Sequence, residues 1–293
     1  MNQSVSVVIP VYKIDLTESE RMSLSQCLNL LYKYDISFVC SKSFDFELFC
    51  KSNEVNQEKI NISRISFANE YFSSIEGYNR LLLSEFFYES FSDFEYILIY
   101  QLDAWVFNDE LGFWVSQNYD YIGAPWIGEE HGNIKNRVGN GGFSLRRVNA
   151  FLKIFKSLRF RYYRINHFSK IFNDRIDYLI RTNTFLYILK VIKALLMSTV
   201  EFLAYKNTLK HYFMLCEINE DILWGVYAPI IFQEFKIPSI DVAMRFSIET
   251  NPENTMLLIS PNLPFGCHAW EKLAKSFWQP FINSSLVSNQ KLS

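Results

Sequence analysis

The stretch EYILIYQLDAWVF, residues 95–107, decides the fold class. Its first half is apolar or aromatic, as in a strand that is buried on both faces of a parallel sheet. It then runs into Asp103, an acid that is costly to desolvate unless a cation or hydrogen-bond donors are its partners. A buried strand that runs into an acid predicts an α/β sheet with a ligand site at the carboxyl edge.

Strand and helix patterns alternate before this stretch. SVSVVIPVY (4–12), ISFVC (36–40) and RISFA (64–68) are short, apolar and rich in β-branched residues, which predicts three more strands. Residues 18–34 and 74–92 carry apolar side chains at helical spacing. The alternation predicts a mostly parallel central sheet with helices on both faces.

The character of the chain changes after Trp126. Residues 128–142, GEEHGNIKNRVGNGG, are rich in glycine and asparagine, which predicts a loop. Residues 151–215 have a helical pattern, and 216–270 return to loops, a helix and short strands. Since no repeat or low-complexity linker separates these parts, we expect a single domain over 1–293 with a helical insertion.

Composition excludes several classes. Hydrophobic residues make up 49% of the chain and charged residues 20%, which is typical of a globular protein. A net charge of -2 gives no overall attraction to nucleic acid. The 17% of aromatic residues indicates an aromatic core, with some rings free to line a sugar or base pocket. Five cysteines without C-x-x-C spacing argue against a zinc site or a disulfide framework and favour a reducing cytoplasm.

The segment 151–210 is strongly basic. It holds twelve Lys and Arg against three Asp and Glu, a charge of +9 in a chain of net charge -2. Apolar runs interleave with these charges, which favours an anionic membrane surface over nucleic acid; a solvated basic helix face is the alternative. Lys190, Lys193 and Glu201 interrupt the longest apolar run, which therefore does not predict a membrane span. MNQSVSVVIPVYK lacks the pattern of a signal peptide, so we expect a cytoplasmic protein, peripheral on the inner face of the membrane.

Two features on the donor side of the predicted site have alternative interpretations. Asp103 suits a hard divalent cation that bridges a diphosphate, or it caps the following turn. Gly141 and Gly142 either permit positive φ in a tight turn or let a substrate approach the backbone closely. The sequence around them is not a P-loop, because no G-x-x-x-x-G-K-[ST] occurs.

Acidic and histidine residues near the C-terminus are also ambiguous on their own. Glu220 and Asp221 precede an apolar run and either cap a helix or supply a general base. His268, in PFGCHAW, is one of four histidines and suits either a buried, hydrogen-bonded side chain or a metal ligand.

In chain order, VVIPVY, YQLDAW, GNGGFSLR, NED and PFGCHAW resemble the shared core of the GT-A fold glycosyltransferases. That core has a nucleotide-binding strand, a D-x-D metal motif, a glycine-rich loop, an x-E-D motif and a metal-binding histidine. YNRLLLSEFFYESF and YDYIGAPW resemble an uncharacterised glycosyltransferase family that accompanies polysaccharide genes. The resemblance runs from residue 5 to residue 275, apart from the basic insertion. It implies one Rossmann-like GT-A domain with a nucleotide-binding half, 1–126, and an acceptor and catalytic half, 127–150 and 211–275.

The resemblance assigns donor-side roles. Asp103 matches the second acid of D-x-D, which holds Mn²⁺ or Mg²⁺ on the donor diphosphate, and His268 completes the metal shell. Gln101 stands where the first acid is expected, which implies fewer metal ligands. The residues implied to hold the nucleotide at the end of the first strand are Pro10, Tyr12 and Lys13.

Acceptor-side roles follow in the same way. Gly141 and Gly142 match the loop under the donor sugar and acceptor, with Trp126 nearby. Asp221 matches the catalytic base of inverting members, and Glu220 lies beside it. The implied reaction transfers a sugar from a nucleotide-diphosphate sugar to a hydroxyl of a glycan or lipid-linked glycan.

Other functions are alternatives to this one. A nucleotide-sugar hydrolase or a nucleotidyltransferase would share the metal acid but need no such acceptor site. A non-catalytic nucleotide- or carbohydrate-binding protein is suggested by Gln101. A glycoside hydrolase needs two carboxyl groups that flank one bond, whereas the adjacent Glu220 and Asp221 are expected to point apart.

Overall fold

A computed structural model describes residues 4–56, 60–127, 137–157 and 219–290. Its contacts divide the chain into two units, one of Met1–Leu152 with Glu220–Ser293 and the other of Lys153–Asn219. Most of the predicted basic insertion, 151–210, lies outside the described residues, so its helices and its membrane role stay predictions. In the described ranges, none of the helices combines the length and apolarity needed to cross a bilayer.

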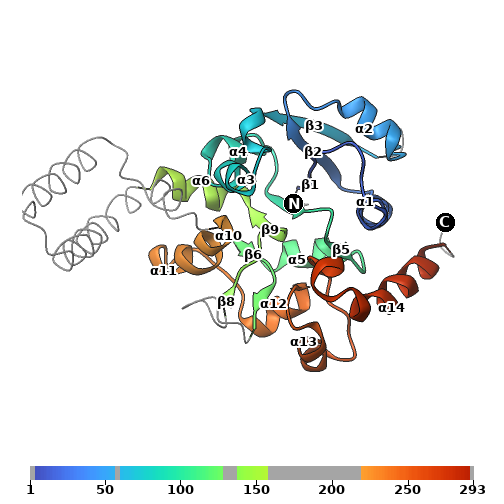
Figure 1. The fold of residues 1–293 in the computed structure, drawn as a ribbon. Coiled ribbons are helices and arrows are strands. Elements are labelled where there is room, and N and C mark those ends of the chain that lie inside the picture. The colour runs from blue at the N-terminus through green and yellow to red at the C-terminus, as the bar shows by residue number, and fades with distance from the viewer. Residues whose placement is uncertain (1–3, 57–59, 128–136, 158–218, 291–293) are drawn as a thin grey trace, which may run out of the picture. The chain divides into compact units, whose positions relative to one another are not determined.

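The first unit is built on a six-stranded sheet in the order β3-β2-β1-β4-β9-β6 (Figure 1). The first four of these strands are mutually parallel, and β9 runs antiparallel to both β4 and β6. The prediction of a mostly parallel central sheet is therefore confirmed. The strands are β1 (Val5–Pro10), β2 (Asp35–Ser41), β3 (Ile62–Phe67), β4 (Tyr96–Tyr100), β6 (Tyr121–Ile122) and β9 (Phe143–Arg147).

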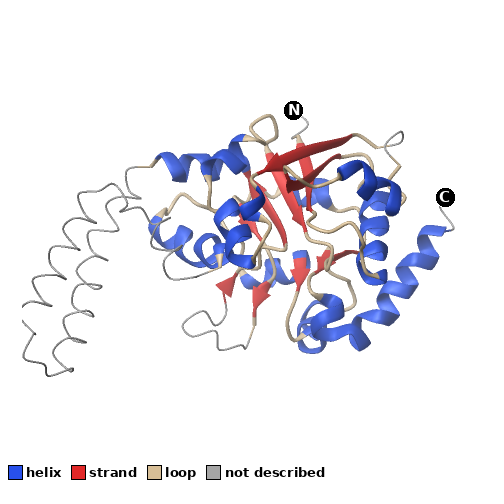
Figure 2. Ribbon diagram, turned by 45° about the horizontal axis from the view of Figure 1, so that its top comes forward, coloured by secondary structure: helices blue, strands red, loops and turns tan. Residues whose placement is uncertain are grey.

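Helices cover both faces of this sheet, as Figures 1 and 2 show. On one face, α1 (Glu18–Leu30) and α2 (Phe46–Ser52) bury side chains in the main apolar cluster with β1, β2 and β4. On the other lie α3 (Ile75–Leu82), α4 (Glu85–Glu89) and α6 (Val148–Lys156). There the Phe67 ring of β3 packs against Phe86 and Phe87 of α4.

Local chemistry sets the helix boundaries. Thr17 and Glu20 form a reciprocal capping box that starts α1, because each side chain satisfies a backbone N–H of the other residue. The predicted helix over 74–92 is instead two helices, α3 and α4. The chain breaks at Ser84, whose hydroxyl and N–H both bond to the Leu81 carbonyl and so compete with continued helix.

The predicted long strand over 95–107 is also divided. β4 ends at Tyr100, and the N–H of Ala104 donates to the Gln101 carbonyl at 2.9 Å, which closes a turn. The chain then enters β5 (Trp105–Val106) in a second sheet, ordered β10-β11-β5, with β10 (Ser247–Ile248) and β11 (Gly266–Cys267). The turn places Asp103 between the two sheets.

Part of the predicted glycine-rich loop over 128–142 is a short strand. Arg137–Val138 (β8) pairs antiparallel with Pro125–Trp126 (β7). The further described elements are η1 (Asn69–Tyr71), α5 (Leu111–Ser116), α10 (Glu220–Ile222), the π-helical η3 (Leu223–Tyr227), α11 (Ala228–Ile231), α12 (Ile240–Phe246), α13 (Pro252–Ile259) and α14 (Trp270–Gln290).

Because β4 is buried along its whole length, truncation within it should destabilise the fold. Leu98→Ala removes a fully buried side chain of the main cluster, and we expect it to lower the free energy of unfolding by about 2–5 kcal/mol. Leu48→Ala, at an exposed position of α2, should change it by less than about 0.5 kcal/mol. Urea unfolding followed by circular dichroism measures both, and equal losses would contradict this assignment of the core.

Candidate active site

The pairing of β5 with β11 brings Asp103 and His268 together. Cys267 lies opposite Trp105 in this antiparallel pairing, so His268, directly after β11, and Asp103, two residues before β5, meet at one end of the small sheet. His268 Nε2 lies 3.1 Å from Asp103 Oδ1. Burial alone would raise the pKa of Asp103, but the hydrogen bond and charge of His268 lower it. The two residues predicted to hold a metal are therefore in direct contact.

A second carboxylate, Glu249, binds the opposite side of the imidazole. Glu249 follows β10, which pairs with β11, and its Oε1 lies 3.0 Å from His268 Nδ1. Burial lowers the pKa of His268, but its hydrogen bonds to Asp103 and Glu249 outweigh this effect and raise the pKa to about 10. Without a metal, His268 is therefore an imidazolium that donates to a carboxylate on each side.

Gln101 adds an uncharged oxygen to this cluster. Its Oε1 lies 3.2 Å from His268 Nε2, and its side chain also hydrogen-bonds to Tyr78. Gln101 therefore occupies the place expected for the first D-x-D acid and faces the same ring nitrogen as Asp103.

These donor atoms meet the needs of a hard divalent ion only in part. In the part of the chain that the structure describes, no three His, Cys, Asp or Glu side chains form a group able to hold a metal. Neighbouring ligands of an octahedral ion bound at about 2.1 Å are separated by about 3 Å. Asp103 and Gln101 each approach His268 Nε2 at about this distance. Each of these two pairs is therefore spaced as neighbouring ligands of one ion would be, and Glu249 contacts the other ring nitrogen of His268.

The loop after β8 lies against both charged centres. A Cβ atom on Gly142 would lie 2.0 Å from His268 Nε2, and one on Gly141 would lie 2.2 Å from Glu220 Oε1. Positive φ, one interpretation of the glycines, occurs at Asn140 instead, at 59°. Asparagine tolerates this region better than most residues. The glycines are needed because protein side chains fill the space beside them.

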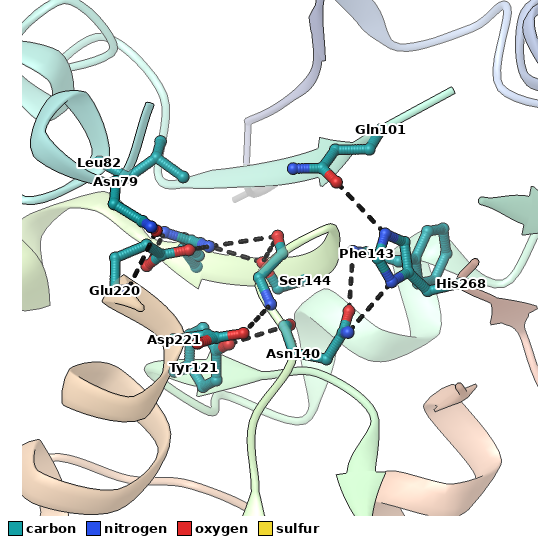
Figure 3. Close-up of polar contacts among 12 residues, drawn as sticks. Asn79, Leu82, Gln101, Tyr121, Asn140, Phe143, Ser144, Glu220, Asp221 and His268 are labelled. Carbon is teal, nitrogen blue, oxygen red and sulfur yellow. Dashed lines mark hydrogen bonds and ion pairs between the residues drawn. The ribbon is translucent and has the colours of Figure 1, made fainter. Parts of the chain in front are cut away.

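Asn140 connects the loop to the His268 cluster. Its side-chain nitrogen lies 3.0 Å from His268 Nδ1 and donates a hydrogen bond to Glu249, the carboxylate that accepts from the same ring nitrogen. The backbone carbonyl of Asn140 accepts from the Tyr121 hydroxyl at 3.0 Å. These contacts fix the loop immediately before the glycine pair (Figure 3).

Glu220 and Asp221 point to different partners, as expected for adjacent residues. Both Glu220 oxygens bind the Arg146 guanidinium, at 2.7 and 3.0 Å. Asp221 Oδ2 accepts from the Gly141 N–H at 3.1 Å, while its buried Oδ1 has no hydrogen-bond partner among the described residues. Burial, followed by the charge of Glu220, raises the pKa of Asp221 to about 7.

The other predicted residues lie outside this polar network. The parallel register that pairs Val8 with Ile99, continued by two residues, places Pro10 level with Gln101. Tyr12 is 65% exposed, and Lys13 is engaged in a 2.8 Å ion pair with Glu20.

Trp126 is buried against the strand that leads into the glycine loop. A Cβ atom on Gly139 would lie 2.0 Å from its ring. Trp126 therefore lies beside the loop with its ring buried within the fold.

Sequence reasoning missed Glu249, Asn140 and Arg146. Glu249 directly follows the short buried strand β10. Asp103 was identified as an acid at the end of a strand, and the same criterion could have identified Glu249. Asn140 lies inside the glycine motif. Arg146 belongs to an Arg-Arg pair that is typical of a solvated strand end, and nothing local to it indicates complete burial.

The family model for DUF5672, a protein of unknown function, matches residues 61–268. The chain therefore belongs to the DUF5672 family. A search of curated proteins found no match.

Several solved glycosyltransferase structures are remotely similar. S. aureus TarS 1-349 matches with 14% identity and a TM-score of 0.35, over 53% of this chain and 49% of its own. The Mn/GDP form of core-mannan synthase A (CmsA/Ktr4) from Aspergillus fumigatus matches with 11% identity and a TM-score of 0.41, over 58% and 64%. The mannosyltransferase PcManGT from Pyrobaculum calidifontis, in complex with GDP-Man and Mn²⁺, matches with 13% identity and a TM-score of 0.34, over 50% and 45%. The chain thus spans about half the length of TarS 1-349.

A methyl group on Gly142 should disrupt the His268 cluster. Because the added carbon would lie 2.0 Å from Nε2, Gly142→Ala should displace the loop or the imidazole and destabilise the fold by about 1–3 kcal/mol. Gly112→Ala is the matched control, since its Cβ would meet nothing nearer than 3.6 Å and lies in α5. We expect it to be neutral or stabilising by up to about 1 kcal/mol. Thermal unfolding distinguishes the two, and an unchanged melting temperature for Gly142→Ala would refute the steric argument.

The raised pKa of Asp221 predicts a pH-dependent contribution to stability. Between the ordinary carboxyl pKa of 3.8 and about 7, the folded protein holds a proton that the unfolded chain has released. The contribution of Asp221 to the free energy of unfolding should therefore fall as pH rises through this window, by about 4 kcal/mol at most. Asp221→Asn retains an acceptor for the Gly141 N–H but cannot ionise. Unfolding curves from pH 4 to about 8 should show a wild-type decrease, relative to this variant, that levels off above the folded-state pKa. Parallel pH profiles would contradict the shift.

Proposed function

We propose that this protein is a glycosyltransferase that moves a sugar from a nucleotide-diphosphate sugar to a hydroxyl of a glycan or lipid-linked glycan, with inversion. The observation that carries the proposal is the state of Asp221. This carboxyl group has a pKa of about 7 and one oxygen that no hydrogen-bond partner reaches among the described residues. The loop that binds it also contacts His268, which lies against Asp103.

Asp221 suits the role of acceptor base. A general base works best when its pKa lies near the operating pH. The Gly141 N–H orients Oδ2, which leaves the lone pairs of Oδ1 available for a proton. In the proposed reaction, the Asp221 carboxylate takes the proton of the acceptor hydroxyl as the hydroxyl oxygen bonds to the anomeric carbon. The bond from that carbon to the diphosphate oxygen breaks, and its electron pair leaves with the nucleoside diphosphate.

Asp103, His268 and Gln101 form the proposed donor-side centre. These residues would hold Mn²⁺ or Mg²⁺, which supplies charge neutralisation at a departing diphosphate. Asp103 is suited to this role because its side chain is 42% exposed, whereas Glu249 is mostly covered and fixes the far side of the imidazole. We propose further that Pro10, Tyr12 and Lys13 bind the nucleoside, in line with their place at the carboxyl edge of β1.

The acceptor side is proposed to use Gly141, Gly142 and Trp126. The two glycines leave a stretch of backbone without side chains between Asp221 and His268, and the Trp126 ring packs against Gly139, two residues before Gly141. Glu220 is proposed to act beside Asp221 without taking the proton, because both of its oxygens bind Arg146. This arrangement disfavours a glycoside hydrolase, because the two carboxylates do not flank one bond.

The cellular setting is likewise a proposal. The basic segment 151–210 suits an anionic membrane surface on the cytoplasmic side, where lipid-linked glycans of an O-antigen or capsule pathway are assembled. Its charge and its interleaved apolar runs support this setting.

The principal alternative is a non-catalytic nucleotide- or carbohydrate-binding protein, which Gln101 favours because it removes one metal-binding acid. A nucleotide-sugar hydrolase or nucleotidyltransferase is the other, and its turnover would need no glycan acceptor. The raised pKa of Asp221 favours the transferase over the binding protein, since a site that only binds has no use for a proton acceptor.

The experiment that tests the function is a ligand panel followed by product analysis. Thermal unfolding is measured with UDP, GDP and their common sugar conjugates, with and without MnCl₂. A ligand at 100 times its dissociation constant adds about 2.7 kcal/mol, which is readily detected. We expect a metal-dependent increase in melting temperature with one nucleotide class, and its loss in Asp103→Ala. The absence of any increase would refute the donor site.

Asp221→Asn separates transfer from binding. With the nucleotide sugar that the panel identifies and a set of glycan acceptors, the variant should retain the thermal shift but lose about 100-fold or more of its turnover. Wild-type turnover should rise with pH and reach half its maximum near pH 7, because Asp221 must be ionised to accept a proton. Turnover that needs no glycan would favour the hydrolase. Donor binding without product from any substrate would favour the binding protein.

A further inference from the structure

Arg146 lies at the centre of the buried polar network, although neither the proposed base nor the metal centre includes it. Its side chain is fully buried on β9. Nε donates to Ser144 Oγ at 3.0 Å, Nη1 to the Tyr88 hydroxyl and Glu220 at 3.0 Å each, and Nη2 to Glu220 at 2.7 Å and the Gly141 carbonyl at 3.3 Å. All five N–H groups of the guanidinium are thus directed at acceptors.

Aromatic rings complete the enclosure of this cation. The guanidinium carbon lies 5.5 Å from the centre of the Tyr121 ring and 5.9 Å from that of Phe151. A planar guanidinium that is paired, stacked and excluded from water has little freedom to move. Arg146 is therefore a rigid point within the site.

This rigid point holds Gly141 next to the proposed base. The Gly141 carbonyl accepts from Arg146 and from the Ser144 hydroxyl, while its N–H donates to Asp221. Glu220 Oε1 and Arg146 Nη2 also occupy the space where a Cβ atom would stand. The Gly141 backbone is therefore held by hydrogen bonds to its carbonyl and from its N–H, and by close packing of Glu220 and Arg146 where a side chain would stand.

The same cation fixes the helix that carries the base. Glu220 and Asp221 are consecutive residues of α10, so the bidentate Arg146–Glu220 pair sets the position of the backbone from which Asp221 extends. Arg146 thus controls both partners of the Gly141–Asp221 hydrogen bond.

We propose that Arg146 is a positioning residue, which orients the Asp221 carboxylate by holding the Gly141 carbonyl and Glu220 at the same time. This inference rests on the proposed role of Asp221 as the acceptor base. Arg146 itself touches neither substrate nor reacting atoms.

A purely structural role is the alternative. Buried ion pairs are weak contributors to stability, and an apolar pair of similar volume often replaces them at no loss. Arg146→Met/Glu220→Met should therefore remain folded while it removes the hold on Gly141. Arg146→Lys keeps the charge but not the planar fork. Arg147→Lys is the matched control, because the adjacent arginine pairs with Asp120 and Glu95 away from the glycine loop.

The Gly141 amide gives a direct spectroscopic readout in the unliganded full chain. Asn140–Gly141 is the single Asn-Gly pair in the sequence, so ¹³C-carbonyl asparagine combined with ¹⁵N glycine selects this one amide. Its shift should report the ionisation of Asp221, to which it donates. Glu220, Glu249, Tyr121 and Arg146 are the ionisable groups that act on that carboxyl.

We expect the wild-type Gly141 amide to titrate between about pH 5 and 9 and Arg147→Lys to match it. In Arg146→Lys and in the Met/Met variant, the titration should be lost although circular dichroism shows a folded protein. An Arg146 variant that titrates like the wild type would overturn the positioning role and leave the proposed function intact. A wild-type amide that does not titrate would instead overturn the assignment of Asp221 as the base.

Discussion

The backbone from Asn140 to Gly142 passes between two charged centres at distances that leave no room for a side chain. Gly142 faces His268, and Gly141 faces Glu220. Any larger residue at either place would force the loop away from one of them. The loop can therefore pass between the His268 cluster and helix α10 only because Gly141 and Gly142 have no side chains. Its own N–H and carbonyl groups then become the contacts that orient the neighbouring side chains (Figure 3).

Charge balance explains why the two ends of the site behave differently. At one end, Asp103 and Glu249 share a single cation, His268, so the cluster retains one net negative charge and favours a further cation. At the other end, Asp221 lies beside Glu220 and forms no ion pair among the described residues, and its pKa rises because ionisation would add a buried negative charge next to Glu220. The first arrangement suits binding of a cation, and the second suits uptake of a proton.

The sequence supplied most of the fold because strand and helix periodicity are local properties. The sheet, its helical cover and the burial of β4 were all predicted from spacing alone. Two of the errors in element boundaries have local causes that compete with periodicity. A turn closes at residues 101–104 inside an apolar run, and Ser84 interrupts an otherwise helical pattern by bonding its own backbone. Neither the turn nor the helix break alters the spacing of apolar residues, so that spacing could not predict them.

The site was less predictable, because its contacts join residues far apart in the chain. Asp103 and His268 were paired by resemblance, and the structure confirms their contact. Glu249 carried a usable local signal as an acid after a strand. Arg146 carried none, since only the fold shows that the first arginine of the pair is fully buried while the second reaches the surface-side acids. Alternation along a strand requires these neighbours to face opposite ways, but which one faces inward depends on the register of β9 against β4.

The adjacent acids Glu220 and Asp221 show how a single motif places two similar side chains in different environments. Their intrinsic chemistry is nearly the same, and their sequence positions differ by one. Arg146 neutralises Glu220, while Asp221 receives one backbone N–H and otherwise faces burial without charge compensation. Environment alone therefore separates a carboxylate that is paired with a cation from one whose pKa is raised to about 7 by burial and by the neighbouring acid. The division persists only as long as Arg146 is held by Glu220 in preference to Asp221, and the bidentate geometry of that pair is what maintains the preference.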